Sequence, residues 1–387
     1  MPVNRTFEEI NCKIKKKEVV VLTAEEIIPL VEERGIKKAT EEIDVVTTGT
    51  FGPMCSSGAI INFGHSDPPI RMKKIWLNDV EAYAGLAAVD AYIGATQLSE
   101  SKNIEYGGAH VIEDFISGKQ IKLKALSPGT DCYPRREIET YINKESVNQA
   151  ILFNPRNSYQ NYNVAINTSQ RKLYTYMGIL LPEMGNANYS TSGQLSPLFN
   201  DPYFMTIGIG TRIFLGGAQG YIIWEGTQFF PQSLNIEKGR IVHRGGTLAV
   251  IGNLKEMSSE YIRAAVFKGY GVSLYVGIGI PIPILNEEIM KCVLIKDEDI
   301  YTEIIDYSIP RLERPSLGWV NYKQLREGKI IVKGKEVPTS SLSSYAKARE
   351  IAQRLKEEIL KANFFLQKPI QTFSQEGVAL KKLLGIH

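Results

Sequence analysis

Apolar and polar side chains alternate with both helical and strand-like periods over the first 150 residues. Segment 24–35 has apolar residues at helical spacing and ends in glycine, and Thr23 and Glu26 have the spacing of a capping box. Segment 42–53 then predicts a strand that opens onto a loop of small residues. Segment 78–91, in which glycine and alanine allow close packing, predicts another helix.

A short helix and then a strand follow, and the strand is marked by the alternating apolar residues Ile121, Leu123 and Ala125. After the next turn, Pro134 suits the first turn of a helix, because proline lacks the N–H that would be unpaired there. Residues 135–142 would continue this helix.

The middle of the chain changes in composition. Segment 151–200 is dense in asparagine, serine and tyrosine, which predicts an irregular, surface-rich region with hairpins. It is not a linker, because it contains apolar side chains that require burial, namely Leu173, Tyr174, Ile179 and Leu180.

Glycine-rich strands are predicted between residues 204 and 285. The stretch "GIGTRIFLGG" places Ile213 where a dinucleotide-binding fingerprint requires its third glycine, and no clear helix follows. Tight packing and turns at strand ends explain the glycines as well as a phosphate site does. A nucleotide site is therefore not the favoured interpretation.

Near the end, segment 328–338 predicts a hairpin, and segment 340–366 predicts a strong amphipathic helix. Apolar residues Ile351, Leu355 and Ile359 lie four apart on one face of it, and two supporting ion pairs are expected, Glu350–Arg354 and Glu357–Lys361. The helix is expected to serve packing or an interface, which makes a homodimer plausible.

These patterns predict a mixed α/β fold. We expect one large mixed-sheet core with glycine-rich strands in residues 1–338 and a C-terminal helical extension in residues 339–387.

The composition narrows the possible partners. The chain has 387 residues, 43% of them hydrophobic, and its 45 basic against 42 acidic residues give a net charge of +3. This balance gives no reason to expect a nucleic-acid partner. The longest apolar run, 271–285, is short for a membrane span and contains Pro281 and Pro283, so it predicts a buried strand with its exit loop. Without a signal-peptide pattern, the protein is expected to be cytoplasmic.

Four cysteines are present: Cys12, Cys55, Cys132 and Cys292. None forms a CxxC pair, so neither a structural metal nor an iron–sulfur cluster held by this chain is expected. Cys292 alternates with apolar residues and is expected in the core.

Cys132 lies in "SPGTDCYPRRE", where Arg135, Arg136 and the predicted helix start would lower a thiol pKa. Asp131 would oppose this effect beside the sulfur, or would instead cap the helix. A reactive thiol and a partly buried thiol both fit these residues.

Cys55 lies among glycines and serines in "GTFGPMCSSG", a backbone that bends sharply and can hold an anion or a thiolate. A small buried side chain in a tight loop fits equally well. His65 and His110 each adjoin glycine and precede a carboxylate, which suits either acid–base work or a hydrogen-bonded loop residue. Arg71 would suit a substrate carboxylate.

Long segments resemble one known family, and the resemblance covers nearly the whole chain. They are "GTFGPMCSSGAIINFGHSDPPIRM", "NDVEAYAGLAAVDAYIGATQ", "YGGAHVIEDFISGK", "LKALSPGTDCYPRRE" and "GIGTRIFLGGAQGYIIWEGTQ". The chain is similar in these segments to the homocysteine-biosynthesis family of anaerobic archaea and bacteria, whose proposed activity is L-aspartate semialdehyde sulfurtransferase. The resemblance implies that residues 1–338 are the catalytic core, without the CBS modules of many members and without a ferredoxin domain.

The family's two functional cysteines match Cys55 and Cys132, and the second is implied to be the nucleophile and persulfide carrier. The resemblance implies an enzyme that adds sulfur from sulfide or a persulfide to L-aspartate semialdehyde and reduces the product to L-homocysteine. It also implies no cofactor bound by this chain, and an external low-potential electron donor, such as a separate ferredoxin-type protein. We expect His65 or His110 to move protons. The candidates for substrate binding are Arg71, Asp131, Arg135 and Arg136, of which one arginine would hold the carboxylate.

Two other classes of function remain open. A non-catalytic persulfide carrier would require an exposed Cys132, whereas an enzyme would hold Cys132 in a pocket. A cysteine-dependent acyltransferase would require backbone amides around Cys132 that form an oxyanion hole.

Overall fold

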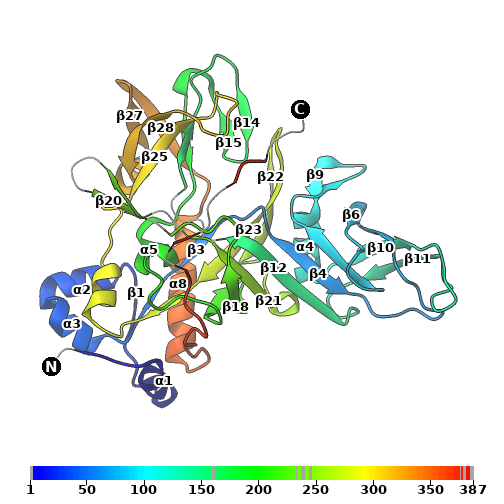
Figure 1. Ribbon diagram of the computed structural model, residues 1–387, viewed down its shortest axis with the longest axis horizontal. Coiled ribbons are helices and arrows are strands. Elements are labelled where there is room, and N and C mark those ends of the chain that lie inside the picture. Colours follow the sequence, from blue (N-terminus) through cyan, green and yellow to red (C-terminus); the bar gives the residue numbers. More distant parts are fainter. Residues whose placement is uncertain are drawn as a thin grey trace.

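The computed structural model describes residues 3–157, 162–231, 233–236, 240–243, 246–374, 376–377 and 381–383. A nine-stranded sheet, here called the central sheet, occupies the middle of the molecule (Figure 1). Its strands run in the order β22 (Ile262–Phe267), β23 (Gly271–Gly279), β17 (Arg212–Leu215), β18 (Ala218–Glu225), β21 (Leu248–Asn253), β12 (Gln149–Asn157), β4 (Gly58–Asn62) and β7 (Asp90–Gly94), and β3 (Thr50–Pro53) pairs with β23. The predicted glycine-rich strands are confirmed.

A six-stranded lateral sheet lies on the right of Figure 1. It contains β11 (Glu137–Ile142), β10 (Ile121–Leu126), β5 (Lys74–Leu77), β6 (Val80–Ala82), β8 (Leu98–Ser99) and β9 (Asn103–Gly107). Helix α4 (Gly108–Ile116) contacts strands of both this sheet and the central sheet. The largest apolar cluster runs through these two sheets and α4, which confirms one large mixed core.

Two predicted helices are wrong, and both segments form strands of these sheets. In segment 78–91, Asn78 and Asp79 have positive φ and form a turn, and Val80 and Ala82 are buried on either side of the exposed Glu81. That burial pattern has the period of a strand.

The segment after Pro134 forms β11, which pairs antiparallel with β10. Ion pairs join the two strands across the pairing, Lys122–Glu139 and Lys124–Glu137. The isoleucines, threonine and tyrosine of β11 suit such a strand, so pairing with β10 overrides the helix-start signal of the proline.

A third, distal sheet of six strands lies at the upper left of Figure 1. It contains β26 (Ser316–Asn321), β25 (Tyr301–Asp306), β13 (Val164–Ile166), β16 (Ala187–Tyr189), β28 (Lys335–Ser341) and β27 (Lys329–Val332), with α7 (Tyr322–Arg326) beside it. The predicted β27–β28 hairpin is confirmed. Another hairpin, β14 (Leu173–Thr175) and β15 (Gly178–Leu180), buries Leu173 and Leu180, but Tyr174 is exposed, contrary to expectation.

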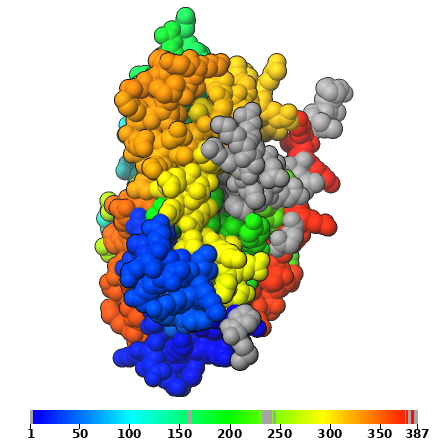
Figure 2. All heavy atoms as spheres, turned by 90° about the vertical axis from the view of Figure 1, so that its left-hand side faces the viewer, coloured from blue at the N-terminus to red at the C-terminus, as the bar shows by residue number. Residues whose placement is uncertain are grey.

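The N-terminal part forms helices around a three-stranded sheet. The helices are α1 (Phe7–Lys16), α2 (Ile27–Arg34) and α3 (Ile36–Glu42), and the strands are β1 (Val21–Thr23), β2 (Val45–Thr47) and β24 (Pro281–Pro283). The predicted capping box is present, because the Thr23 amide donates to Glu26 at 2.7 Å and the Glu26 amide donates to the Thr23 hydroxyl at 3.3 Å. Figure 2 shows these helices in blue below the orange strands of the distal sheet, with the yellow α6 region (Glu287–Cys292) between them.

The remaining elements are short. They are α5 (Pro197–Asn200), the paired strands β19 (Ser233–Ile236) and β20 (Arg240–His243), and the 3-10 turns Pro182–Met184, Gly193–Leu195 and Leu254–Glu256. In the part of the chain that the structure describes, no helix is long and apolar enough to cross a membrane.

The predicted amphipathic helix is confirmed as α8 (Tyr345–Leu360), with its predicted apolar face fully buried. It packs against β3 and β23, and glycines make this approach possible. A Cβ on Gly49 would lie 2.2 Å from the Ala348 carbonyl oxygen, and a Cβ on Gly277 would lie 2.8 Å from Ile351. A side chain at Gly49 would push the helix backbone away, whereas one at Gly277 would displace the end of the Ile351 side chain.

Of the two ion pairs predicted on α8, Glu357–Lys361 is present at 3.7 Å. The other is wrong, since Glu350 pairs with Lys347 and Arg354 pairs with Glu358. The boundary expected between residues 338 and 339 lies inside β28, so the division into a core and an extension stays a prediction.

Candidate active site

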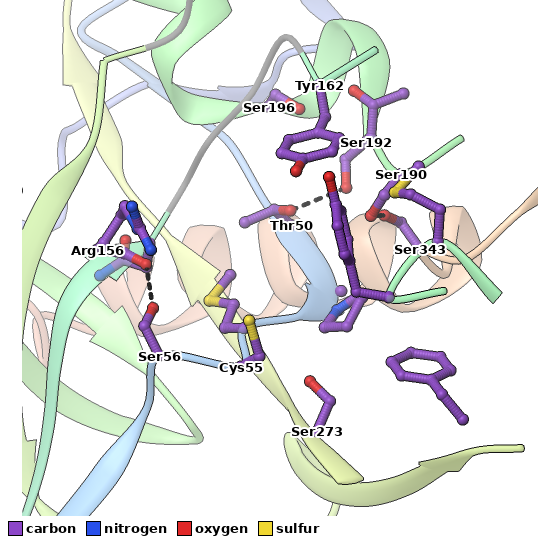
Figure 3. Close-up of a pocket in the computed structure, with 18 of the residues that line it drawn as sticks. Thr50, Cys55, Ser56, Arg156, Tyr162, Ser190, Ser192, Ser196, Ser273 and Ser343 are labelled. Carbon is purple, nitrogen blue, oxygen red and sulfur yellow. Dashed lines mark hydrogen bonds between the residues drawn. The ribbon is translucent and has the colours of Figure 1, made fainter. Parts of the chain in front are cut away.

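A cavity of about 300 Å³ lies where the central sheet meets the distal sheet, and Cys55 is in its wall (Figure 3). Its lining comes from segments far apart in the sequence: β3 and the turn after it, the end of β12, the β14–β15 turn, the loop after β16, the β22–β23 turn, and Ser343, which lies two residues before α8. Convergence of so many segments on one thiol is typical of an active site.

The chain positions Cys55 by a tight turn between β3 and β4. The Met54 amide donates to the Leu274 carbonyl of β23 at 2.7 Å, and the Ser57 amide donates to the Met54 carbonyl at 3.0 Å. Asn154 of β12 donates to the Ser57 hydroxyl at 2.7 Å. Both neighbouring strands therefore hold the turn, and the Cys55 side chain is exposed. A small buried side chain, one of the two interpretations from the sequence, does not agree with this exposure.

Tyrosines form part of the wall around this thiol. Burial raises the pKa of Tyr270, with smaller contributions from the charges of Cys55 and Tyr176. The Tyr176 and Tyr307 hydroxyls lie 2.9 Å apart, and the Tyr307 hydroxyl donates to Asn163 at 2.9 Å. The raised pKa means that Tyr270 is a neutral phenol at neutral pH, so its hydroxyl can donate a hydrogen bond beside Cys55.

Arg156 brings a positive charge to the cavity. Its side chain is partly buried and contacts Gln228, and its carbonyl accepts a hydrogen bond from the Ser56 hydroxyl at 2.6 Å. Arg156 and Tyr270 were not among the residues predicted from the sequence, because neither lies in a motif and only the fold brings them beside Cys55.

Cys132 lies elsewhere, at the exposed tip of the β10–β11 hairpin. The Thr130 and Tyr133 amides donate to each other's carbonyls at 2.9 and 3.1 Å, which closes a tight turn around Cys132. No helix begins at Pro134, so the positive helix end expected beside the thiol is absent from this turn. Asp131 is exposed at the same tip.

The hairpin tip packs against the segment that follows β4. The His65 ring stacks on the Tyr133 ring with 6.1 Å between centroids. The Arg135 guanidinium donates to the Asp67 and Pro68 carbonyls at 2.6 and 3.0 Å, so backbone oxygens already occupy it.

Arg71 and Arg136 are exposed near this tip, Arg71 beside the Ile70–Arg135 bridge and Arg136 next to Arg135 in sequence. The structure thus brings the hairpin-tip residues together, but none of them lines the cavity around Cys55. Their roles in substrate binding stay predictions.

Cys55 and the hairpin tip are separated by strand β4. Cys55 precedes this five-residue strand and His65 follows it, so they lie beyond its opposite ends. Five extended residues span about 16 Å. The two cysteines therefore occupy two different regions of the chain.

His110 is part of the N-terminus of α4. Its Nδ1 accepts a hydrogen bond from the Gly107 amide at 3.2 Å, and its ring stacks on Tyr106 at 5.0 Å. Burial lowers the pKa of His110, which keeps the imidazole neutral at pH 7. His110 does not line the cavity, and its role as a proton carrier stays a prediction.

The other two cysteines differ in environment. Burial raises the pKa of the Cys292 thiol to about 11, but the residue is only half-buried, so the expected core position is not fully reached; Cys12 is exposed. Within the described ranges, no group of three or more histidine, cysteine, aspartate or glutamate side chains gathers as a metal site.

Comparison with known proteins adds to this geometry. A family model described as "Homocysteine biosynthesis enzyme, sulfur-incorporation" matches residues 19–366. The L-aspartate semialdehyde sulfurtransferase of Methanosarcina acetivorans is 55% identical over 97% of this chain and 73% of its own length. The L-aspartate semialdehyde sulfurtransferase of Methanocaldococcus jannaschii is 55% identical over 96% of this chain and 74% of its own length.

More distant similarity also exists. An uncharacterized protein of Methanothermobacter thermautotrophicus is 26% identical over 79% of this chain and 68% of its own length. No solved structure matches the chain.

Proposed function

The chain belongs to the family of homocysteine-biosynthesis enzymes that incorporate sulfur, and on this premise we propose that it is an L-aspartate semialdehyde sulfurtransferase. It would place a sulfur atom on the aldehyde carbon of L-aspartate semialdehyde and give L-homocysteine. The observation that carries this proposal is the exposed Cys55 thiol in the wall of a cavity that also contains Arg156 and Tyr270. The names of the two relatives that are 55% identical support it.

The reaction balances with sulfide as the sulfur donor and an external reductant. Sulfide adds to the aldehyde carbon, the adduct loses water to give a thioaldehyde, and two electrons with two protons reduce the C=S bond to the thiol. Sulfur that arrives as a cysteine persulfide requires two further electrons and two protons, which cleave the S–S bond and release sulfide. We assign both reductions to a low-potential donor of the ferredoxin type.

Cys55 is the thiol at the proposed place of addition. Its thiolate adds to the aldehyde carbon and forms a thiohemiacetal, which holds that carbon in the cavity until sulfide replaces the cysteine sulfur. Tyr270, whose hydroxyl is protonated at neutral pH and which lines the same cavity, donates the hydrogen bond and then the proton that the aldehyde oxygen requires.

Cys132 is proposed as the persulfide carrier. Its exposed position at a hairpin tip allows a sulfur-donating protein to reach it, whose cysteine persulfide passes its outer sulfur atom to the Cys132 thiolate and is left as a thiol. Sulfur leaves Cys132 as sulfide and enters the Cys55 cavity in that form. This route does not require the two thiols to meet, which agrees with their positions beyond opposite ends of β4.

The exposure of Cys132 also favours a second candidate, a persulfide carrier that passes sulfur to another protein. An acyltransferase centred on Cys132 finds no support, because the Thr130 and Tyr133 amides, which an oxyanion hole would need, both donate within the turn.

Paired cysteine variants test these proposals. Cys132→Ser and Cys55→Ser proteins are treated with sulfide under anaerobic, mildly oxidising conditions, and persulfides are mapped by mass spectrometry. In parallel, homocysteine formation from L-aspartate semialdehyde is measured with sulfide and a low-potential reductant. We expect Cys55→Ser to abolish product, and Cys132→Ser to lose the persulfide but retain turnover with free sulfide. Persulfide on Cys132 with no homocysteine from the unaltered protein would support the carrier instead.

A further inference from the structure

Three buried polar side chains in the cavity wall lack hydrogen-bond partners. Asn157, Ser196 and Ser273 are exposed by only 2%, 1% and 1%. Among the described residues, neither side-chain atom of Asn157 and neither serine hydroxyl finds a partner. Buried polar groups are paired in the large majority of cases, and an unpaired one destabilises the fold. Three of them around one cavity indicate groups that are kept for a ligand.

Other polar side chains in the wall of the same cavity do have hydrogen-bond partners. The Ser190 and Ser343 hydroxyls lie 2.8 Å apart, and the Ser192 hydroxyl donates to Thr50 at 3.1 Å. The unpaired atoms are therefore not a general property of this wall.

The strands that carry Asn157 and Ser273 are the two that hold the Cys55 turn. Asn157 ends β12, directly after a register irregularity that begins at Asn154, and Asn154 bonds to the turn. Ser273 lies in β23, next to Leu274, whose carbonyl accepts the Met54 amide. In Figure 3, Ser273 lies below Cys55 and Ser196 lies on the opposite side of the cavity. A small molecule between them would contact the Cys55 thiol.

The charges of the wall indicate the chemical class of that molecule. Arg156 lines the cavity, and none of the lining residues in the described part of the chain is acidic. Hydroxyls and an arginine suit a carboxylate, because both donate hydrogen bonds to it. The Asn157 amide offers a donor and an acceptor together, which matches a carboxylate and an ammonium group carried on one carbon atom.

We propose that Asn157, Ser196 and Ser273, with Arg156, form the subsite that binds the ammonium and carboxylate groups of an α-amino acid, and so direct its side-chain end to Cys55. This inference rests on the proposed function, since that function supplies an amino-acid substrate. It assigns the substrate carboxylate to Arg156 instead of the three arginines near the hairpin tip.

Binding of a stable substrate mimic tests the subsite without turnover. The probe is L-homoserine, which carries a hydroxyl group in place of the aldehyde, and binding to the reduced protein is measured by titration calorimetry. Asn157→Leu and Ser273→Ala are each expected to weaken binding about 10-fold, which is about 1.4 kcal/mol. Homoserine lactone lacks the free carboxylate. It should bind to the unaltered protein at least about 10-fold more weakly than L-homoserine does.

Thr48→Val is the control, because the buried Thr48 hydroxyl lies outside the cavity lining and already donates to the Ile280 carbonyl at 2.6 Å. It should leave L-homoserine affinity unchanged and lower the melting temperature, since it removes a satisfied hydrogen bond. Ser273→Ala should maintain or raise the melting temperature of the free protein, because an unpaired buried group is removed.

Three results would overturn the subsite: no L-homoserine binding to the unaltered protein, dissociation constants within twofold in both Asn157→Leu and Ser273→Ala, or equal affinity for the lactone. The outcome is separable from the proposed function. The expected binding pattern without homocysteine formation supports the subsite and counts against the reaction. Homocysteine formation with an unchanged KM in both variants supports the reaction and overturns the subsite.

Discussion

Asn154 donates a 2.7 Å hydrogen bond to the Ser57 hydroxyl, and this contact joins a strand of the central sheet to the turn that carries Cys55. Ser57 in turn donates to the Met54 carbonyl at 2.7 Å, and the Arg156 amide donates to the Asn154 side-chain oxygen at 2.7 Å. One buried amide therefore fixes both the thiol and the arginine of the proposed site.

Replacing this amide should damage both stability and activity. Asn154→Leu leaves the buried Ser57 hydroxyl without its donor, so the free energy of unfolding should fall by about 1–3 kcal/mol. Homocysteine formation should fall as well, because the Cys55 turn is no longer held. Asn148→Leu is the control, since its amide bonds to Asn62 at 2.9 Å at an exposed site. Equal losses in the two variants, measured by urea denaturation, would contradict this account.

Tyr270→Phe should lower kcat about 100-fold without loss of stability, because it removes only the proposed proton donor. The raised pKa of Tyr270 also predicts that its ionisation does not limit the rate up to pH 9. Rate measurements from pH 6 to 9 test both points. Tyr221→Phe, at an exposed position outside the cavity, should leave kcat unchanged.

His110 should make the protein less stable in acid. Its pKa is lowered from an ordinary value of 6.5, mainly by burial, and Glu113 and Asp114 oppose this effect while Lys102 adds to it. The folded protein thus binds this proton less tightly than the unfolded chain, so the free energy of unfolding falls as the pH drops below 6.5 and levels off below the folded pKa.

The variant His110→Gln keeps an acceptor for the helix cap but cannot titrate. Urea denaturation at pH 7.5 and 5.5 should show that the free energy of unfolding falls less between these two pH values in this variant than in the unaltered protein. In His65→Gln, which changes an exposed position, the free energy of unfolding should fall between pH 7.5 and 5.5 as much as in the unaltered protein. If both variants behave alike, burial of His110 is not the cause.

Alkylation should separate the four cysteines by exposure and pKa. At pH 8 a thiol with a pKa of about 11 is only about 0.1% thiolate, so Cys292 should react with iodoacetamide far more slowly than the others. Cys12, Cys55 and Cys132 are exposed and should react first. Peptide mass spectrometry over time gives the order, and early labelling of Cys292 would show that it is not buried as described.

Oxidation tests the separation of Cys55 and Cys132, the two cysteines to which roles are proposed. A disulfide requires Cβ atoms about 3.5–4.5 Å apart, and Cys55 and Cys132 occupy regions beyond opposite ends of β4. Diamide treatment of the dilute protein should therefore give no Cys55–Cys132 disulfide within one chain. Such a bond in non-reducing peptide maps would contradict the separation and support direct exchange between the thiols.

Local patterns predicted α8, the β27–β28 hairpin and the strand-rich middle. In each case, the secondary structure that the local residues favour is also the one that the tertiary packing requires. They failed after Pro134, where pairing with β10 outweighs a good helix start. In segment 78–91, the turn at Asn78 and Asp79 was mistaken for helical chain.

The candidate site was harder to predict than the fold. A sharp bend at Cys55 follows from the local glycines and serines, but those residues left open whether the thiol is exposed or buried. Its surroundings do not, because Asn157, Ser273 and Ser343 are brought together only by strand pairing and by the chain that leads into α8. No residue spacing in the sequence predicts that these side chains lie together.

The chain that leads into α8 limits how far the protein can be shortened. Ser343 is part of the cavity wall, the Leu342 carbonyl accepts the Tyr275 hydroxyl at 2.8 Å, and the Ser344 amide donates to the Phe51 carbonyl at 2.9 Å. A fragment that stopped at residue 338 would have a gap beside Cys55 and a bare apolar face on β3 and β23. The smallest autonomous enzyme must therefore run through the end of α8, and deletion mapping from the C-terminus should lose soluble protein and activity at the same step.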